Sequence, residues 1–146
     1  MIFVAEVRPR WSDMDAYGHV NHARTVTLLE EARIELLFTE AERQGAEALM
    51  AGVVVGRLAV DFHAPLVVSH RTTTIRVELS VLELRVASFT LAYRVYAGPS
   101  TEDTLVATAE TMMVPYDLRH GHARRLSEAE RDFLASWRTD GGMRTA

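Results

Sequence analysis

The fold is decided by residues 13–43, which read DMDAYGHVNHARTVTLLEEARIELLFTEAER. Up to His22 this stretch is dense in Asp, Gly, Asn and His, a composition typical of a loop. From residue 23 onward it contains good helix formers and neither Gly nor Pro, which predicts a helix over about 23–43. A loop rich in reactive side chains therefore leads directly into a long helix.

The predicted helix is apolar on two sides. At about 100° per residue, Ile34, Phe38 and Ala41 fall on one side, and a larger apolar group falls on another. That larger group comprises Val26, Leu28, Leu29, Ala32, Leu36 and Leu37. Because a surface helix normally carries a single apolar stripe, we expect protein to wrap most of this one.

Alternation of apolar and polar residues with a period of two marks strands on both sides of the helix. One strand is predicted within 2–10, and three long strands are predicted near 53–63, 75–81 and 89–95. A fourth long strand is predicted near 104–116, which is rich in Thr, Val and Met. Short turns between long strands imply antiparallel pairing. A helix lying across such a sheet makes an α+β domain, and the length of 146 residues predicts a single domain over 1–146.

The end of the chain carries a helix-start signal. Ser127 and Glu130 have the spacing of a capping box and precede the apolar Phe133 and Trp137, which predicts a terminal helix over about 127–137.

One face of the predicted sheet covers the long helix. The other face needs a cover of its own, such as a partner subunit.

The composition excludes several classes of protein. A net charge of −4 argues against a nucleic-acid-binding module. The absence of Cys removes disulfides, thiolate metal sites and a catalytic thiol. All 16 basic residues are Arg, which excludes a Schiff-base Lys and a phosphate-loop Lys. Without an apolar run of about 18 residues or a signal-peptide pattern, we expect a cytoplasmic protein with neither nucleic acid nor a membrane as partner.

The junction of loop and helix has the parts of an acyl-transfer site. The first backbone N–H groups of a helix have no partner within it, and the helix dipole makes this end positive. Such an end can hold an oxyanion or polarise a carbonyl oxygen. A carboxylate within reach can act as nucleophile or general base. Together they suffice for acyl transfer without Ser or Cys.

This junction also carries a resemblance to a known family. The pattern D-x-D-A-x-G-H-V-N-x-A over residues 13–23, followed by L-L-E-E-A-R over 28–33, resembles the acyl-CoA thioesterases of the hotdog fold, in their 4-hydroxybenzoyl-CoA thioesterase-like branch. The segment V-D-F-x-x-P at 60–65 fits the same family, and the resemblance extends over about 4–117. It implies a long central helix wrapped by a five-stranded antiparallel sheet, with two protomers joined edge to edge.

The resemblance assigns roles to the residues of the loop. The family's catalytic carboxylate corresponds to Asp15, and the backbone amide that polarises the carbonyl corresponds to His22, whose side chain is a second catalytic candidate. Gly18 would allow a tight turn and close approach of the acyl group. Asn21 would cap the helix or pin the loop. His19 is a further substrate-binding candidate, with a hydrogen bond inside the loop as its alternative role.

The resemblance to the family is weaker at the positions that usually lie near the CoA phosphates. This chain departs from the family's usual Gly-Asp at Ser69-His70 and from its Ser-rich turn at 84–88. Arg side chains suit phosphates because they bind them through two parallel hydrogen bonds. We assign this role to Arg85 for its place at a turn. The other strand arginines, for which solvent exposure is the simpler reading, are Arg57, Arg71, Arg76 and Arg94.

Several of the polar residues, Asp15 included, also have a purely structural interpretation. Asp15 could be an Asx-turn residue, and Asp13 is more simply a turn or salt-bridge residue. A related branch of the family uses a helix carboxylate, for which the candidates are Glu30, Glu31 and Glu35. Arg33 falls near the main apolar side, where it needs a carboxylate partner, and we expect it to order the loop or a dimer seam.

The histidines do not have the spacing of a metal site. They include His19, His22, His63 and His70, with no Cys and no His-x-x-x-His on a helix. We therefore predict no metal and no cofactor, since CoA is part of the substrate.

The sequence as a whole predicts a hotdog acyl-CoA thioesterase that forms dimers or tetramers, with its active site at the subunit interface. Two alternatives stay open. One is a hotdog protein that binds acyl-CoA without cleaving it. The other is a hotdog hydratase or dehydratase, which matches the loop less well.

Overall fold

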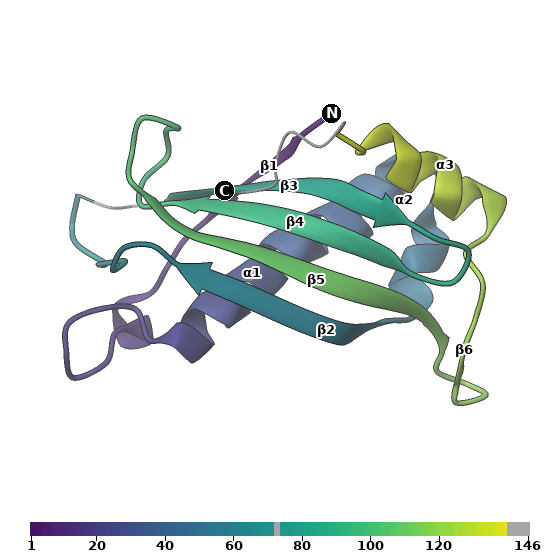
Figure 1. Cartoon of the computed structure of the whole chain (residues 1–146), viewed down its shortest axis with the longest axis horizontal. Coiled ribbons are helices and arrows are strands. Elements are labelled where there is room, and N and C mark those ends of the chain that lie inside the picture. Colours follow the sequence, from purple (N-terminus) through teal and green to yellow (C-terminus); the bar gives the residue numbers. More distant parts are fainter. Residues whose placement is uncertain (72–73, 140–146) are drawn as a thin grey trace.

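A computed structural model describes residues 1–71 and 74–139 of the chain (Figure 1). The elements in chain order are β1 Phe3–Val7, η1 Trp11–Asp13, α1 His22–Ile34, η2 Glu35–Glu40, α2 Ala41–Arg43, η3 Glu47–Ala51, β2 Val53–Phe62, β3 Ile75–Leu84, β4 Phe89–Tyr96, β5 Leu105–Asp117, β6 His122–Ala123 and α3 Glu128–Ser136. The predicted strands and both predicted helices are confirmed within a few residues. No helix in the described ranges is long and apolar enough to span a membrane.

The central helix is continuous through α1, η2 and α2 and spans 22 residues. Its middle segment, η2, has π-helical hydrogen bonding, which the sequence did not reveal. The helix ends at Gly45, whose φ of 81° is the left-handed conformation that terminates many helices. The predicted helix over 23–43 is therefore confirmed, with His22 as its first residue.

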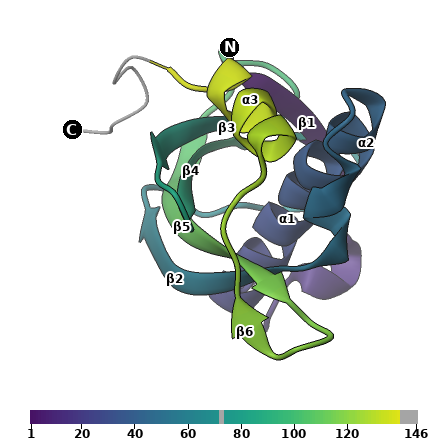
Figure 2. The same ribbon diagram turned by 90° about the vertical axis from the view of Figure 1, so that its right-hand side faces the viewer.

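A curved antiparallel sheet surrounds this helix. The strand order is β1-β3-β4-β5-β2, and β6 adds a short pair with the end of β5. Seen along the helix, the sheet curls around α1 from β1 to β2 (Figure 2). Register shifts between Val55 and Arg57 in β2 and between Val81 and Glu83 in β3 increase the local twist. This is the hotdog architecture, and β1 and β2 are its two edges.

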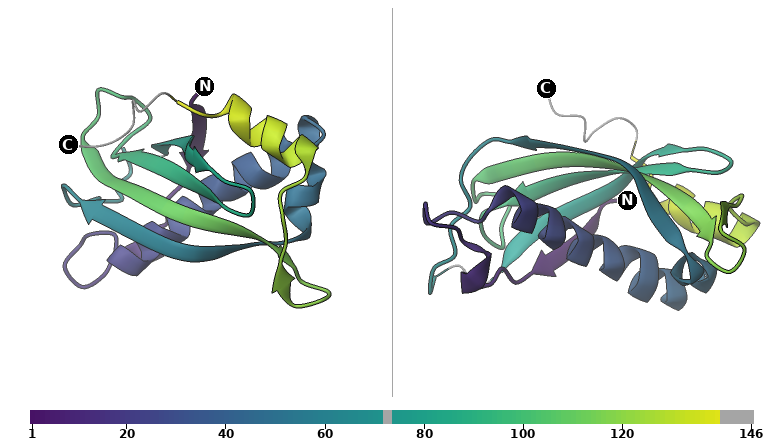
Figure 3. Two further views of the ribbon diagram at one scale, coloured as in Figure 1. Left: turned by 45° about the vertical axis from the view of Figure 1, so that its right-hand side comes forward. Right: turned by 90° about the horizontal axis from the view of Figure 1, so that it is seen from below.

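The core lies between the concave face of the sheet and one side of the helix. Leu29, Ala32 and Leu36 are buried there, and the side chains of β3 and β4 that face them include Leu79 and Leu91. Figure 3 shows α1 lying across this face. The second apolar side of the helix is covered only in part by this chain, because Ala41 is fully buried while Ile34 is 41% and Phe38 37% exposed. The expectation that protein wraps both sides therefore fails for a single copy.

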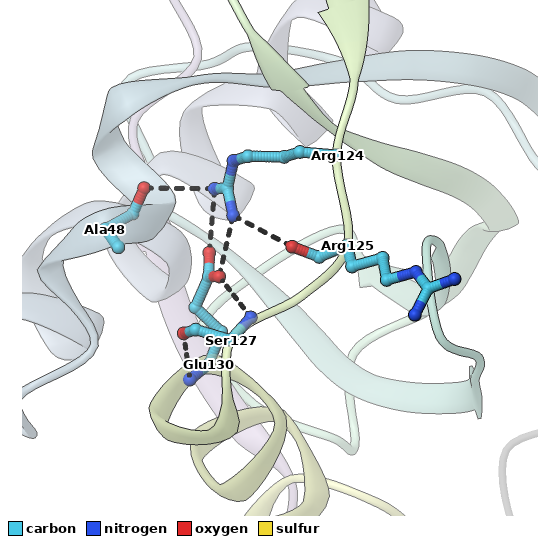
Figure 4. A network of polar contacts seen from close by, with 5 residues as sticks. All are labelled: Ala48, Arg124, Arg125, Ser127 and Glu130. Carbon is cyan, nitrogen blue, oxygen red and sulfur yellow. Dashed lines mark hydrogen bonds and ion pairs between the residues drawn. The ribbon is translucent and has the colours of Figure 1, made fainter.

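The C-terminal helix is held by a buried ion pair (Figure 4). Glu130 is fully buried, and its two carboxylate oxygens accept hydrogen bonds from Arg124 at 2.8 and 2.9 Å. The Ser127 N–H donates to the same carboxylate, and the Ser127 hydroxyl accepts from the Glu130 N–H, which completes the predicted capping box. Arg124 also donates to the Ala48 carbonyl oxygen. The pair therefore joins α3 to the segment at the end of the central helix.

Candidate active site

The loop ahead of α1 is anchored at both ends by its own polar groups. Asp13 is buried, and its carboxylate accepts from the Arg10 N–H at 2.7 Å and from the Arg10 guanidinium at 3.1 Å. The Asp13 carbonyl oxygen accepts from the Asn21 N–H. Asp13 is therefore a structural residue, in agreement with the simpler reading of the sequence.

Asp15 is held in one orientation by two hydrogen bonds. Its Oδ1 atom accepts from the Tyr17 N–H at 2.9 Å, and its Oδ2 atom accepts from the Asn21 side-chain amide at 3.4 Å. The first contact is the Asx turn that the sequence suggested. A carboxylate oxygen has more than one lone pair, so each oxygen keeps capacity for a water molecule or a substrate carbonyl carbon. The Asx turn and a reactive role are thus compatible.

Two residues shape the junction of loop and helix. Gly18 has φ of 76°, and a Cβ atom there would meet nothing within 4 Å, so glycine is favoured for its left-handed backbone and not for space. Asn21 is the N-cap of α1, and its Oδ1 atom accepts from the Ala23 N–H at 2.9 Å. In the parts of the chain that the structure describes, the His22 N–H has no acceptor. This amide is free to bind a ligand at the positive end of the helix.

A hollow of about 550 Å³ opens in front of this junction. Its lining residues are Asp15, Tyr17, His19, Val20, His22, Thr25, Phe62, His63, Ala64, Pro65, Leu66, Val106 and Ala107. The loop is joined to the opposite wall by a hydrogen bond from the Val20 N–H to the Leu66 carbonyl oxygen at 2.7 Å. The wall is mostly apolar, and both Asp15 and His22, the first residue of α1, line the hollow. This arrangement can hold a polarised carbonyl group next to a base or nucleophile.

The predicted site residues divide into three groups. Asp15, His19 and His22 line the hollow together. Gly18 and Asn21 are not among its lining residues and act through the loop and the helix cap instead. Arg85 lies at the opposite end of the sheet, in the β3–β4 turn, where its side chain pairs with Glu83 and its carbonyl oxygen accepts from Arg131 of α3. One copy of the chain does not bring Arg85 to Asp15.

The helix carboxylates lie away from this hollow. None of Glu30, Glu31 and Glu35 is among its lining residues. Burial, together with the charge of Glu6, raises the pKa of Glu35 above its usual value. Within the described residues the polar partners of Arg33 are Tyr93 and Glu30, neither of which belongs to the loop, so its expected place at a dimer seam stays a prediction. Its guanidinium donates to the Tyr93 hydroxyl at 3.3 Å and lies 3.6 Å from the Glu30 carboxylate.

The histidines considered as metal ligands lie apart from one another or have other partners in the part of the chain that the structure describes. Between residues 1 and 139, leaving out 72 and 73, no three His, Asp or Glu side chains are grouped to hold a metal ion. His63, one of the histidines considered, hydrogen-bonds the Thr108 hydroxyl through Nε2 at 2.9 Å.

Sequence reasoning did not identify the wall opposite Asp15. The segment 62–66 forms most of it, and Thr25, Val106 and Ala107 complete it. A usable signal was present, because Pro65 follows directly after a predicted strand and stops it from continuing. The pairing of this segment with β5, through the His63 N–H and the Val106 carbonyl oxygen, joins positions 43 residues apart, which local patterns do not reveal.

Comparison with protein families agrees with this geometry. The model of the thioesterase-like superfamily matches residues 9–137. The chain belongs to this superfamily. Among relatives, it is similar to the acyl-CoA thioester hydrolase YbgC of Escherichia coli and Shigella flexneri, with 30% identity over 119 residues, 80% of this chain and 83% of YbgC. This thioesterase-like protein is thus a relative of enzymes that hydrolyse acyl-CoA.

Solved structures of thioesterases are also similar to this chain. The PA2801 protein of Pseudomonas aeruginosa superposes with a TM-score of 0.71 and 28% identity, covering 88% of this thioesterase-like chain and 95% of PA2801. A thioesterase of Thermus thermophilus, determined in complex with coenzyme A and zinc, superposes with a TM-score of 0.72 and 25% identity, covering 92% of each chain. The resemblance to hotdog thioesterases that the loop motif carried is confirmed.

Proposed function

We propose that this protein hydrolyses an acyl-CoA thioester to a free acid and CoA, with Asp15 as the reactive carboxylate. The observation that carries the proposal is that Asp15 and the start of α1 line one hollow, where the His22 N–H has no acceptor in the described parts of the chain. Thioester hydrolysis needs this pair, because negative charge develops on the carbonyl oxygen as the carbon is attacked.

The reaction follows from these two groups. The thioester carbonyl oxygen accepts a hydrogen bond from the His22 N–H, and Asp15 either attacks the carbonyl carbon or removes a proton from the attacking water. The tetrahedral oxyanion collapses with cleavage of the C–S bond, and CoA leaves as a thiolate that takes a proton from solvent. If Asp15 attacks directly, water then cleaves the resulting anhydride. Either route consumes one water molecule. In this proposal the thioester and the pantetheine arm pass His19 and His22, which line the hollow.

A second copy of the chain completes the site in this proposal. β2 is an edge strand of the sheet, and exposed apolar side chains lie on it and on the neighbouring side of the helix: Ile34, Phe38, Val54, Val55, Leu58 and Phe62. Antiparallel pairing of two β2 edges would cover the outer part of this surface and form one continuous sheet, with the hollow beside the helix enclosed between the two copies. It would also reverse the direction of the second sheet, so that its β3–β4 turn with Arg85 lies toward the Asp15 end. Arg85 is thereby proposed to bind CoA phosphates across the interface.

Substitution in β2 tests the assembly. We expect wild-type protein to sediment as a dimer or tetramer and Val55→Asp to sediment as a monomer, because the new charge lies in the proposed interface. Val86→Asp is the matched control, since Val86 is 58% exposed and Val55 46%, but Val86 lies in the β3–β4 turn. A monomeric wild type, or a Val55→Asp protein that still assembles, would refute the β2 interface.

A substrate panel tests the activity. Short, long and aromatic acyl-CoAs are incubated with the wild-type protein, and release of the free thiol is followed; the chain has no Cys to contribute background. We expect catalytic release of CoA from at least one class. Binding of intact acyl-CoA without release, measured by calorimetry on the same panel, would replace the proposal with a binding function.

A further inference from the structure

A second hollow opens between the central helix and β2, beyond the one that contains Asp15. It encloses about 400 Å³, and its apolar lining residues are Ile34, Leu37, Phe38, Val53, Val54, Val55 and Met113. The helix makes its main strand contacts with β1 and β3 at the other side of the sheet. The side toward β2 therefore stays open. Arg33 and Glu30 are the charged residues that line this hollow.

Arg33 is buried there with few partners. Its side chain is only 10% exposed, yet within the described ranges its guanidinium makes a single hydrogen bond, to the Tyr93 hydroxyl at 3.3 Å. The Tyr93 hydroxyl is itself bonded to Thr111 at 2.8 Å. The nearest carboxylate, of Glu30, lies 3.6 Å away on a side chain that is 61% exposed. A guanidinium has five N–H donors, so most of them have no protein partner beside an apolar wall.

The two hollows lie along the same side of the central helix, and residues of β2 line both of them. His22 and Arg33 are 11 residues apart, about three helical turns, so they lie on the same side of the helix and roughly 16 Å apart along its axis. On the opposite wall Phe62 lines the first hollow and Val55 the second. The bulge at Gly56 keeps both on the concave side of β2. An acyl chain whose carbonyl group is held at the His22 amide can therefore extend toward Arg33.

We propose that Arg33 selects acyl groups that carry an oxygen acceptor, best a carboxylate, at the end remote from the thioester. This inference rests on the proposed thioesterase function and names its substrate class. A carboxylate matches the fork of N–H donors in a guanidinium and accepts two hydrogen bonds at once. Helix side chains lean toward the N-terminus, which places the guanidinium roughly 10 Å from the carbonyl site, the reach of a medium-length chain.

The burial of Arg33 explains why such an end group would be selected. A charge that loses its water without gaining hydrogen bonds is unfavourable, so an apolar chain end that fills this hollow imposes a cost, while a carboxylate replaces the lost hydrogen bonds. The hydrogen bond from Arg33 to the Tyr93 hydroxyl fixes one side of the guanidinium. The remaining donors are then available to a ligand in the hollow that Arg33 lines. Arg33 is accordingly a specificity-determining residue and takes no part in bond cleavage.

The test compares matched pairs of substrates. kcat/KM is measured by thiol release for octanoyl- and decanoyl-CoA and for their ω-hydroxyl and ω-carboxyl counterparts. We expect wild-type protein to favour the ω-carboxyl form over the unsubstituted form by at least about tenfold, with the ω-hydroxyl form in between. In Arg33→Met this ratio is expected to fall to about one or below. A merely structural role would lower all rates together and leave the ratio unchanged.

Control variants keep the test decisive. Arg43→Met removes an exposed arginine of the same helix, which pairs with Glu40, and should leave the ratio unchanged. If Arg33→Met does not fold, as judged by circular dichroism, Arg33→Lys replaces it and is expected to show a reduced ratio. Equal or faster cleavage of the unsubstituted esters by wild-type protein overturns the inference but not the thioesterase function. Cleavage of another acyl-CoA but of none of these esters overturns the inference alone, and no cleavage of any acyl-CoA tested overturns both.

Discussion

Asp15→Asn is expected to lower kcat for acyl-CoA hydrolysis by roughly 10³-fold. Asparagine has nearly the same shape, and its carbonyl oxygen can still accept from the Tyr17 N–H that holds Asp15. It cannot attack a thioester or remove a proton from water at neutral pH. The loss should therefore appear in kcat, measured by thiol release at saturating acyl-CoA, while the melting temperature changes little.

Asp132→Asn is the matched control for this prediction. Asp132 is exposed on α3, at the opposite end of the sheet from the loop, and its substitution should leave kcat unchanged. If Asp15→Asn keeps the wild-type kcat, the assignment of Asp15 fails, and the helix carboxylates become the remaining candidates.

Glu130→Ala is expected to lower the free energy of unfolding by about 3 kcal/mol, because it leaves the Arg124 guanidinium without its carboxylate partner. The contact is specific, since both carboxylate oxygens are bonded to Arg124 and one also to the Ser127 N–H. Urea denaturation at neutral pH measures the change. Glu128→Ala, an exposed position in the first turn of the same helix, should cost far less. Equal effects of the two substitutions would refute the role of the ion pair.

The same carboxylate predicts a pH dependence. Burial alone raises the pKa of Glu130, but the hydrogen bonds from Arg124 and Ser127 outweigh it and hold the pKa below its usual 4.5. The unfolded state therefore binds the proton more readily, so the stabilisation is complete above about pH 4.5 and is lost as the pH falls through the lower folded-state pKa. Glu130→Gln should show a shallower loss of unfolding free energy in this acidic range than wild type. Parallel curves would contradict the assignment.

Most of the fold could be predicted because its elements are long and regular. The helix over 22–43 contains no Gly or Pro, and β3 and β4 alternate apolar and polar residues along most of their length. The π-helical segment at 35–40 leaves no such signature, since its residues are ordinary helix formers. The exposure of Ile34 and Phe38 was also outside local reasoning. Apolar periodicity predicts that a side chain is buried, but it does not show whether the same chain or a partner subunit buries it.

The candidate site was predictable where it is local. Asp15, the cap at Asn21 and the turn at Gly18 lie within seven consecutive positions, and short-range geometry determines their arrangement. Arg33 and Tyr93 are 60 residues apart, so their contact depends on how the helix lies on the sheet. Arg85 was chosen for its place at a turn, but a sequence does not tell at which end of the sheet a turn lies.

The most direct test of the account is to titrate Asp15→Asn and wild-type protein with the acyl-CoA that the wild type cleaves fastest and then to analyse both mixtures for free CoA. The account predicts that the variant binds the ester with near wild-type affinity and that the ester is recovered intact, while the wild-type mixture contains CoA and the free acid. Release of CoA by the variant at the wild-type rate would contradict it.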